Sequence, residues 1–322
     1  MDLGSPAVSI IVPAYRTEDT IAETLESIFR QTFTNFEVVI VSNEGYANEE
    51  DLTRVLQPWA ERIVRVRQKT PGLANARNAA LPFCRAPLIA LLDSDDIWEP
   101  DYLEVQVGMM LADPSIAVVY CNAVFFGDPA TAGQTFMQWF PSHGPVTFLS
   151  LLKKETCVFV SVTARLDAVR KAGDFDGSLA GAEDLDLWLR IARQGGKFAY
   201  HDKPLVRYRA RPTSLSNDPE VMGGHLLAVL QKNSALPDLN PEERACVAEM
   251  IALQQAQISF VRGKRALYHS EFADAIRCIS ESNRRLKRAK LSLILIAIRL
   301  APNLLLSWVR HRYPTEHSFM HS

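Results

Sequence analysis

Short, continuously apolar runs alternate with helix-like segments along the first hundred residues. The apolar runs are 8–13, 36–41, 63–66 and 87–92. Each has the length and the β-branched content of a buried strand. Between them the sequence predicts helices at 17–31, 52–60 and from 75 to 80. Strands that alternate with helices in this way indicate an α/β fold with a mainly parallel sheet, covered by helices on both faces.

The mixed pattern continues to about residue 217 and then changes to helix only. Up to that point we expect helices at 101–112 and 183–194, strands at 116–126 and 204–209, and loops at 127–133 and 214–219. Beyond it the helical spacing is found at 226–230, 244–262 and 272–280. We therefore predict one domain over 1–217 and an all-helical region over 218–322. Residues 263–279 are similar to one tetratricopeptide hairpin, although no internal repeat accompanies them.

Composition and charge exclude several classes of protein. The net charge is −2, so no global field favours a nucleic acid partner. The five cysteines are scattered without a CxxC pair, which is typical of reduced thiols in a cytosolic protein. The first residues lack the basic region of a signal peptide, and we expect the catalytic part to face the cytoplasm.

The most informative polar segment is an acidic cluster, Asp93-Ser94-Asp95-Asp96, which follows the apolar run 88–92. Three carboxylates at one strand end repel one another, and this arrangement favours a divalent cation such as Mg²⁺ or Mn²⁺ with oxygen ligands. The alternative is a solvated turn in which Asp96 caps a helix that begins near Pro100.

Two further segments have a functional and a structural interpretation. Glu183-Asp184 opens the helix 183–194, where Asp184 is a candidate general base and a dipole-stabilising helix start is the alternative. The segment 72–78 enters a helix, and its amides and Arg77 are suited to binding phosphate. The alternative is a plain helix start, with Arg77 in a surface or interdomain ion pair.

The order of these pieces resembles glycosyltransferase family 2, the inverting enzymes with the GT-A fold, over residues 7–217. The segments that carry the resemblance are Val8 to Tyr15, Gly72 to Asn78, Leu92 to Asp96, Gly173 to Asp176, Glu183 to Trp188 and Tyr208 to Pro212. It implies a Rossmann-like domain, with a nucleotide-sugar half over about 1–100 and an acceptor half over 101–217.

The resemblance also implies roles for individual residues. Nucleotide-sugar contacts are expected from Pro13, Ala14, Tyr15, Asn43, Arg77, Asp93, Ser94 and Arg211. Asp95 is expected to bind an Mn²⁺ or Mg²⁺ ion that bridges the diphosphate, and Asp184 to act as the base. Glu183 and Trp188 are expected on the acceptor side.

Two positions depart from the family pattern. Where an aspartate commonly helps to read the nucleobase, this chain has Ser42-Asn43-Glu44-Gly45. The sequence therefore does not determine which nucleobase is bound, and a UDP-sugar is the starting expectation. Arg211 stands where a histidine is frequent. Arginine cannot ligate a metal, although it pairs with phosphate oxygens.

The segment 291–309 is apolar over 19 residues but contains Arg299, Pro302 and Asn303 near its middle. Five of the seven residues from Arg284 to Lys290 are basic, and a second basic cluster follows at 310–312. This pattern favours a helix that lies on an anionic membrane surface. A helix packed within the protein and a membrane-spanning helix are the alternatives.

Together these features predict an enzyme that transfers a single sugar from a nucleotide donor to a glycan or lipid-linked acceptor. It would work in the cytoplasm, peripherally at the inner membrane face. The chain lacks a Gln-x-x-Arg-Trp motif and multiple apolar spans, which argues against a processive synthase. The alternatives are a catalytically inactive scaffold that keeps the fold, and a nucleotidyltransferase, which also places acidic residues at strand ends.

Overall fold

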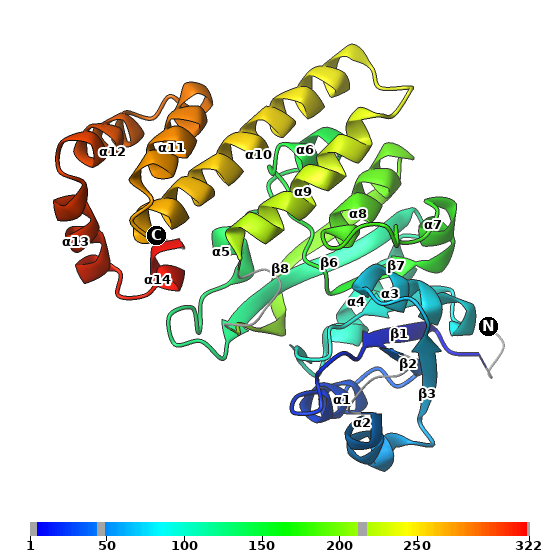
Figure 1. Cartoon of the computed structure of the whole chain (residues 1–322). Coiled ribbons are helices and arrows are strands. Elements are labelled where there is room, and N and C mark those ends of the chain that lie inside the picture. Colours follow the sequence, from blue (N-terminus) through cyan, green and yellow to red (C-terminus); the bar gives the residue numbers. More distant parts are fainter. Residues whose placement is uncertain (1–4, 44–48, 212–217, 321–322) are drawn as a thin grey trace. The chain divides into compact units, whose positions relative to one another are not determined.

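The chain forms two compact units, residues 1–211 and 212–322. The computed structural model describes residues 5–43, 49–211 and 218–320. The first unit is α/β and the second is helical, so the predicted fold class and the helical C-terminal region are confirmed (Figure 1).

An eight-stranded mixed sheet forms the centre of the first unit, in the order β3-β2-β1-β4-β7-β6-β8-β5. The strands are β1 (Val8–Pro13), β2 (Phe36–Asn43), β3 (Ile63–Gln68), β4 (Leu88–Leu91), β5 (Ile97–Trp98), β6 (Ile116–Phe126), β7 (Val162–Arg165) and β8 (Lys197–Arg209). The strands β1 to β4 are mutually parallel, as are β6 and β8. The strand β7 runs antiparallel to both β4 and β6, and β5 runs antiparallel to β8.

Helices cover both faces of this sheet, because its strands are apolar on both sides. The helical segments are α1 (Ile21–Phe29), α2 (Glu49–Leu56), η1 (Gln57–Trp59), α3 (Leu73–Ala80), η2 (Leu81–Phe83), α4 (Tyr102–Ala112), α5 (Phe136–Trp139), α6 (Phe148–Leu152), α7 (Leu166–Lys171) and α8 (Glu183–Arg193). Side chains of α1, α2 and α4 share one core with Val8, Ile10 and Val12 of β1. Helix α3 packs on β1, β2 and β3 from the other side (Figure 1).

The sequence pattern predicts the apolar strands but not those that depend on a neighbour. The strand predicted at 204–209 is the end of β8, which begins seven residues earlier at Lys197. Its first half is polar and lies partly exposed, and it is held by parallel pairing with β6. The strand β5 is two residues long and is stabilised by pairing with β8. The strand β7 has buried residues from Val162 to Ala164 and lies in the apolar run 157–164, which is not among the predicted strands.

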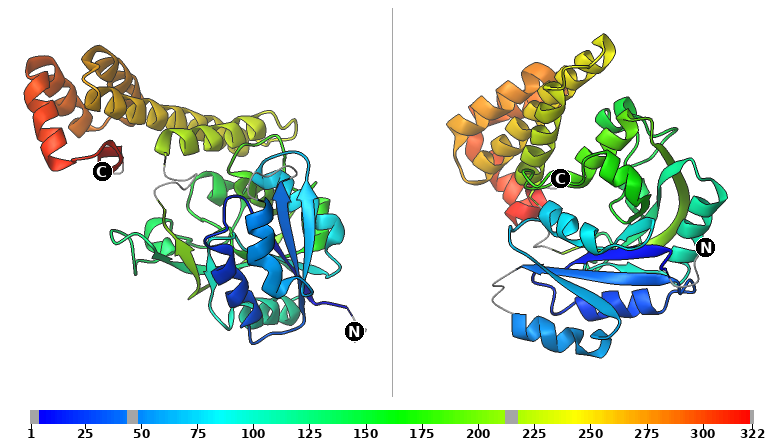
Figure 2. Two further views of the ribbon diagram at one scale, coloured as in Figure 1. Left: turned by 60° about the horizontal axis from the view of Figure 1, so that its bottom comes forward. Right: turned by 90° about the vertical axis from the view of Figure 1, so that its right-hand side faces the viewer.

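The second unit consists of helices that pack in sequential pairs (Figure 2). They are α9 (Pro219–Ser234), α10 (Pro241–Tyr268), α11 (Phe272–Leu286), α12 (Ala289–Leu300), α13 (Pro302–Arg312) and α14 (Glu316–Met320). The predicted helical segments all lie within them, whereas residues 214–217 of the predicted loop fall outside the described residues. The hairpin predicted at 263–279 is formed by α10 and α11, and Gly263 allows their close approach. A Cβ at Gly263 would lie 2.5 Å from Cγ1 of Ile279.

The apolar stretch 291–309 is divided into two helices, not one. The break falls at Ala301, and Pro302, which lacks an amide hydrogen, occupies the first turn of α13. No helix among residues 5–43, 49–211 and 218–320 combines the length and the apolar character needed to cross a membrane.

Candidate active site

Parallel pairing brings three of the predicted segments to one edge of the sheet. Pro13 of β1 pairs with Val41 of β2, and Ile11 pairs with Leu91 of β4. The residues that follow these strands therefore share the carboxyl edge, where ligands of open α/β sheets bind. Asn43 and Asp93 lie at this edge, together with the loop that begins at Ala14.

The acidic turn after β4 is fastened to the beginning of α1 through its main chain. The hydroxyl groups of Thr20 and Thr24 donate to the carbonyl oxygens of Ser94 (3.0 Å) and Asp96 (2.8 Å). Ser94 is largely buried, and its carbonyl oxygen is the acceptor that ties the turn to α1.

Asp96 is the anchor of the turn rather than a helix cap. Its side chain is fully buried, and its Oδ1 accepts a hydrogen bond from the amide of Arg209 at 2.9 Å. Burial and the charges of Asp95 and Asp93 raise the pKa of Asp96 well above its usual range. Helix α4 instead has Asp101 at its N-cap position. The sequence motif around Tyr208 contains Arg209 but does not reveal this supporting contact.

Asp93 and Asp95 remain accessible, each with 29% of its side chain exposed. Burial and the neighbouring charge of Asp93 raise the pKa of Asp95, while Arg211 opposes the shift. The Nε of Arg211 lies 3.5 Å from Oδ2 of Asp95, and its Nη2 donates to the Thr20 hydroxyl at 2.9 Å. The turn therefore presents two carboxylates and one guanidinium at the sheet edge.

Arg77 joins this turn to the start of α8. Only 1% of its side chain is exposed, and its guanidinium contacts Glu183 Oε1 at 2.5 Å and Asp93 Oδ1 at 3.0 Å. Both terminal nitrogens of Arg77 are engaged by carboxylates, the buried Glu183 and the partly exposed Asp93, so the guanidinium does not face a phosphate site in this geometry. The ion pair is buried within the first unit, whereas the alternative that we considered was a surface or interdomain pair. It unites elements that are 106 residues apart in sequence.

Asp184 lies in the first turn of α8, next to this buried pair. Burial and the adjacent Glu183 carboxylate raise the pKa of Asp184 to about 6, although Arg77 opposes the shift. Its Oδ1 accepts the amide of Leu185 at 2.8 Å, and the preceding Ala182 has a left-handed backbone rather than a capping side chain. A carboxyl group with this pKa is half ionised at about pH 6 and mostly ionised at neutral pH, so it can accept a proton there.

The two residues expected on the acceptor side are both enclosed. Glu183 is buried against Arg77, and Trp188 is a core residue with 1% exposure. The periodicity of α8 does not reveal which of its faces is covered, because that depends on packing against other elements. Trp139 and Phe140, at the end of α5, are the aromatic residues that lie open in this half. Trp139 is oriented by a hydrogen bond from its Nε1 to Gln134 Oε1 at 2.9 Å.

The first loop and the end of β2 complete the edge. Ala14 is buried and its amide donates to Val41, whereas the ring of Tyr15 is more than half exposed. Asn43 ends β2, and its side-chain oxygen accepts a hydrogen bond from Nε2 of Gln68 at the end of β3. Glu44 and Gly45 of the same motif lie outside the described residues. The side chain of Asn43 is thus oriented by a residue that the sequence does not single out.

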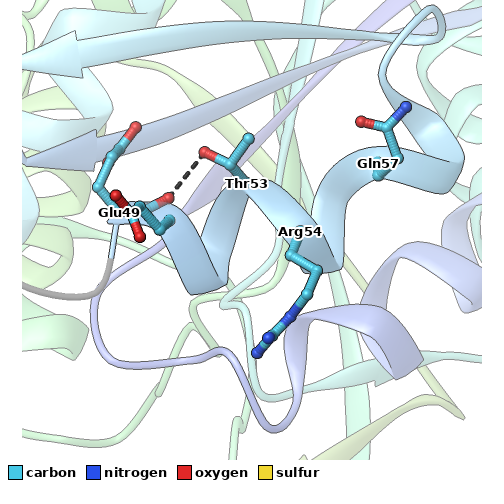
Figure 3. Close-up of a pocket in the computed structure, with 5 residues that line it drawn as sticks. Glu49, Thr53, Arg54 and Gln57 are labelled. Carbon is cyan, nitrogen blue, oxygen red and sulfur yellow. Dashed lines mark hydrogen bonds between the residues drawn. The ribbon is translucent and has the colours of Figure 1, made fainter.

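A separate hollow runs beside α2 (Figure 3). It is lined by Glu49, Glu50, Thr53, Arg54 and Gln57. Figure 3 shows the Thr53 hydroxyl directed at the main chain of Glu49, to which it donates at 2.7 Å. The hollow shares no residue with the predicted site and offers one helical surface only, so it does not compete with the sheet edge as the functional site.

Comparison with known proteins agrees with this geometry. Residues 9–168 match the family described as glycosyl transferase family 2. A curated Escherichia coli protein, UDP-Glc:alpha-D-GlcNAc-diphosphoundecaprenol beta-1,3-glucosyltransferase WfgD, is 31% identical over 213 residues, which cover 66% of this chain and 80% of WfgD. The chain belongs to glycosyl transferase family 2. It is a nucleotide-sugar-dependent glycosyltransferase, as the resemblance in its sequence implies. A further relative is the putative teichuronic acid biosynthesis glycosyltransferase TuaG of Bacillus subtilis, 27% identical over 66% of this chain and 82% of TuaG.

Solved structures of transferases share the fold. The mannosyltransferase PcManGT from Pyrobaculum calidifontis, in complex with GDP-Man and Mn²⁺, matches with a TM-score of 0.62 and 16% identity, over 99% of this chain and 86% of its own. Residues 1–349 of S. aureus TarS, in complex with UDP, match with a TM-score of 0.58 and 17% identity, over 96% of this chain and 92% of that one. The family 2 transferase described here therefore has the predicted GT-A fold.

Proposed function

We propose that this chain transfers one sugar, with inversion at the anomeric carbon, from a nucleoside diphosphate sugar to a lipid-linked glycan. The observation that carries the proposal is the buried bridge through Arg77, which places Asp184 beside the acidic turn. A base of moderately raised pKa and an acidic turn at a ligand-binding edge are the two parts that this reaction needs.

In the proposed reaction the Asp184 carboxylate accepts the proton of an acceptor hydroxyl. The acceptor oxygen forms a bond to the anomeric carbon from the face opposite the diphosphate. The bond between that carbon and the diphosphate oxygen breaks, and its electron pair leaves with the nucleoside diphosphate. Arg211 pairs with the phosphate oxygens, because a guanidinium forms bidentate hydrogen bonds to them.

The acidic turn also fits a divalent metal ion. Asp93 and Asp95 offer partly exposed carboxylate oxygens, and burial together with the charge of Asp93 raises the pKa of Asp95. Among the residues that the structure describes, no group of three or more metal-binding side chains comes together. Mg²⁺ and Mn²⁺ typically take one or two carboxylates together with substrate phosphates, so Asp95, with Asp93 beside it, would hold the ion jointly with the donor. When bound, it would stabilise negative charge on the leaving diphosphate.

The donor and the acceptor are proposed to bind to different halves of the first unit. Residues 1–100 would bind the nucleotide, with Pro13 to Tyr15 lining its pocket and Asn43 facing the base. A uridine donor is the first choice, in line with TarS and WfgD, whereas PcManGT is described with GDP-Man. Residues 101–217 would bind the acceptor, with the exposed Trp139 ring as a stacking surface for a sugar. The lipid-linked acceptor follows WfgD and would bring the enzyme to the cytoplasmic membrane face.

The test is release of nucleoside diphosphate from a panel of UDP- and GDP-sugars, with and without Mn²⁺, in parallel with calorimetric binding of each donor. We expect Asp184→Asn to bind the donor with unchanged affinity and to lose transfer by ~10²–10⁴-fold. Asp95→Ala should instead weaken donor binding in the presence of Mn²⁺.

Glu61→Gln is the matched control, because Glu61 is an exposed carboxylate in the same unit. It should leave both binding and turnover at wild-type levels. Transfer by Asp184→Asn at the wild-type rate would remove Asp184 as the base. A wild-type protein that neither binds nor turns over any donor would favour the inactive scaffold.

A further inference from the structure

The helices α12 and α13 carry apolar side chains on two sides. On one side Leu291, Leu295, Ile298 and Val309 are buried in a cluster with residues of α10, α11 and α14. On the other side five large apolar residues are exposed: Leu293 67%, Ile296 51%, Leu300 81%, Leu304 75% and Trp308 59%. We call these five residues the outer stripe. The second unit packs through the inner side of these two helices, so its folding does not require the outer stripe.

The spacing of the outer stripe gives each helix a narrow exposed apolar face. Ile296 and Leu300 follow Leu293 by three and seven positions, and Trp308 follows Leu304 by four. The members on each helix therefore lie on the same face, above one another. On α12, Lys290 and Arg299 occupy helical positions on opposite flanks of the stripe, and both are exposed. An apolar face flanked by long basic side chains is the arrangement of a helix that lies in a membrane interface.

The charge around the stripe has one sign. From Ser282 to Thr315 the sequence contains eight Lys or Arg residues and no Asp or Glu. All eight are exposed. Within residues 218–320, the part of this unit that the structure describes, the ion pair found for these eight is between Arg285 and Glu249 at 3.5 Å. Arg310 also donates a hydrogen bond to the carbonyl oxygen of Tyr268 at 2.6 Å. Because all eight side chains are exposed, an anionic surface would attract each of their charges within a Debye length.

We propose that the outer stripe inserts into the interface of an anionic lipid membrane, with the flanking basic residues on the headgroups. Trp308 has an indole ring suited to the interfacial depth, and Leu293, Ile296, Leu300 and Leu304 supply the apolar contact. The break at Ala301 divides the stripe between two short helices. The surface belongs to the second unit and does not depend on the proposed transfer reaction, since its test measures no transfer.

The experiment is cosedimentation of the full chain with vesicles of phosphatidylcholine alone or with about one third phosphatidylglycerol, at low and high salt. Wild type should bind the anionic vesicles and be released by salt. The double variant Leu300→Glu with Trp308→Glu should bind at least ~10-fold more weakly, because two apolar groups that enter the membrane interface are replaced by charged ones. Lys290→Gln and Arg299→Gln should each reduce binding about fivefold. Leu111→Glu, at an exposed apolar position in α4, should bind like wild type.

Three results would overturn the proposal. The first is that wild type fails to bind anionic vesicles at low salt, and the second is that the double variant binds as well as wild type. The third is a wild-type dimer in light scattering that the double variant converts to a monomer, with vesicle binding unchanged, which would assign the stripe to a second copy of the chain. Circular dichroism of each variant establishes that it is folded. Donor turnover measured without vesicles separates this result from the fate of the proposed reaction.

Discussion

Replacement of Arg77 by methionine tests whether the buried ion pair organises the site. The guanidinium has 1% exposure and contacts Glu183, which is 5% exposed, and Asp93. Its removal leaves a buried carboxylate without a cation, while methionine fills much of the volume. Breaking a buried pair in this way costs about 3–5 kcal/mol of unfolding free energy. Urea denaturation at neutral pH measures the loss.

The control for this change is Arg30→Met. Arg30 forms an ion pair with Glu26 four residues away, but the two side chains are 74% and 51% exposed. Such a pair contributes about 0.5 kcal/mol or less, so the variant should unfold like wild type. Adding Glu183→Gln to Arg77→Met should restore about 1–3 kcal/mol, because the unpaired charge is removed. A loss of less than about 1 kcal/mol for Arg77→Met would refute a structural role for the bridge.

Three further predictions concern the base, the nucleotide and the helical hairpin. The kcat/KM of wild type should rise with pH through about 6, since Asp184 must be ionised to accept a proton. The pKa of Asp184 in the folded protein exceeds the ordinary value of 3.8, so the stability that this group contributes is present below pH 3.8 and lost as the pH rises through about 6. The unfolding free energy of Asp184→Asn should not show this loss. Asn43→Asp should favour UDP over CDP in calorimetry, because a carboxylate accepts the N3–H of uracil but repels N3 of cytosine; equal affinities would remove residue 43 from base recognition. Gly263→Ala should lower the unfolding free energy by about 1–3 kcal/mol, because its Cβ would lie 2.5 Å from Ile279, whereas Gly224→Ala, with open space at its Cβ, should not.

The sequence predicts those parts of the fold whose burial is intrinsic. β1, β2 and β4 are continuous apolar runs, and the order of motifs along the chain identifies the family before any contact is known. The polar first half of β8 lacks such a signal, because its stability comes from pairing with β6. The apolar run 157–164, which contains most of β7, does carry the signal but is not among the predicted strands.

The candidate site likewise has parts that local sequence features predict and parts that depend on tertiary contacts. The sequence points to the acidic turn and to Asp184, because charged residues at the end of an apolar run and at a helix start are local features. The partners of Arg77 lie 16 and 106 residues away, and no local pattern reveals which carboxylates a buried arginine will meet. Trp188, expected on the acceptor side, lies in the core with 1% exposure. Whether an aromatic residue on an amphipathic helix faces the core or a ligand depends on tertiary packing.

The contacts that hold the acidic turn in place differ from the side chains that are proposed to take part in the reaction. Thr20, Thr24 and Arg209 hold the turn through main-chain atoms and through the buried Asp96, and the ion pair of Asp95 with Arg211 is only partly buried. Substitution of the Asp95 side chain therefore alters the reacting surface while the main-chain contacts of the turn and the buried Asp96 remain. A protein built in this way can exchange its donor or its dependence on metal by a few substitutions at the edge of the sheet. Arg211, which meets Asp95 at this edge, is a position where such an exchange would change the charge of the site.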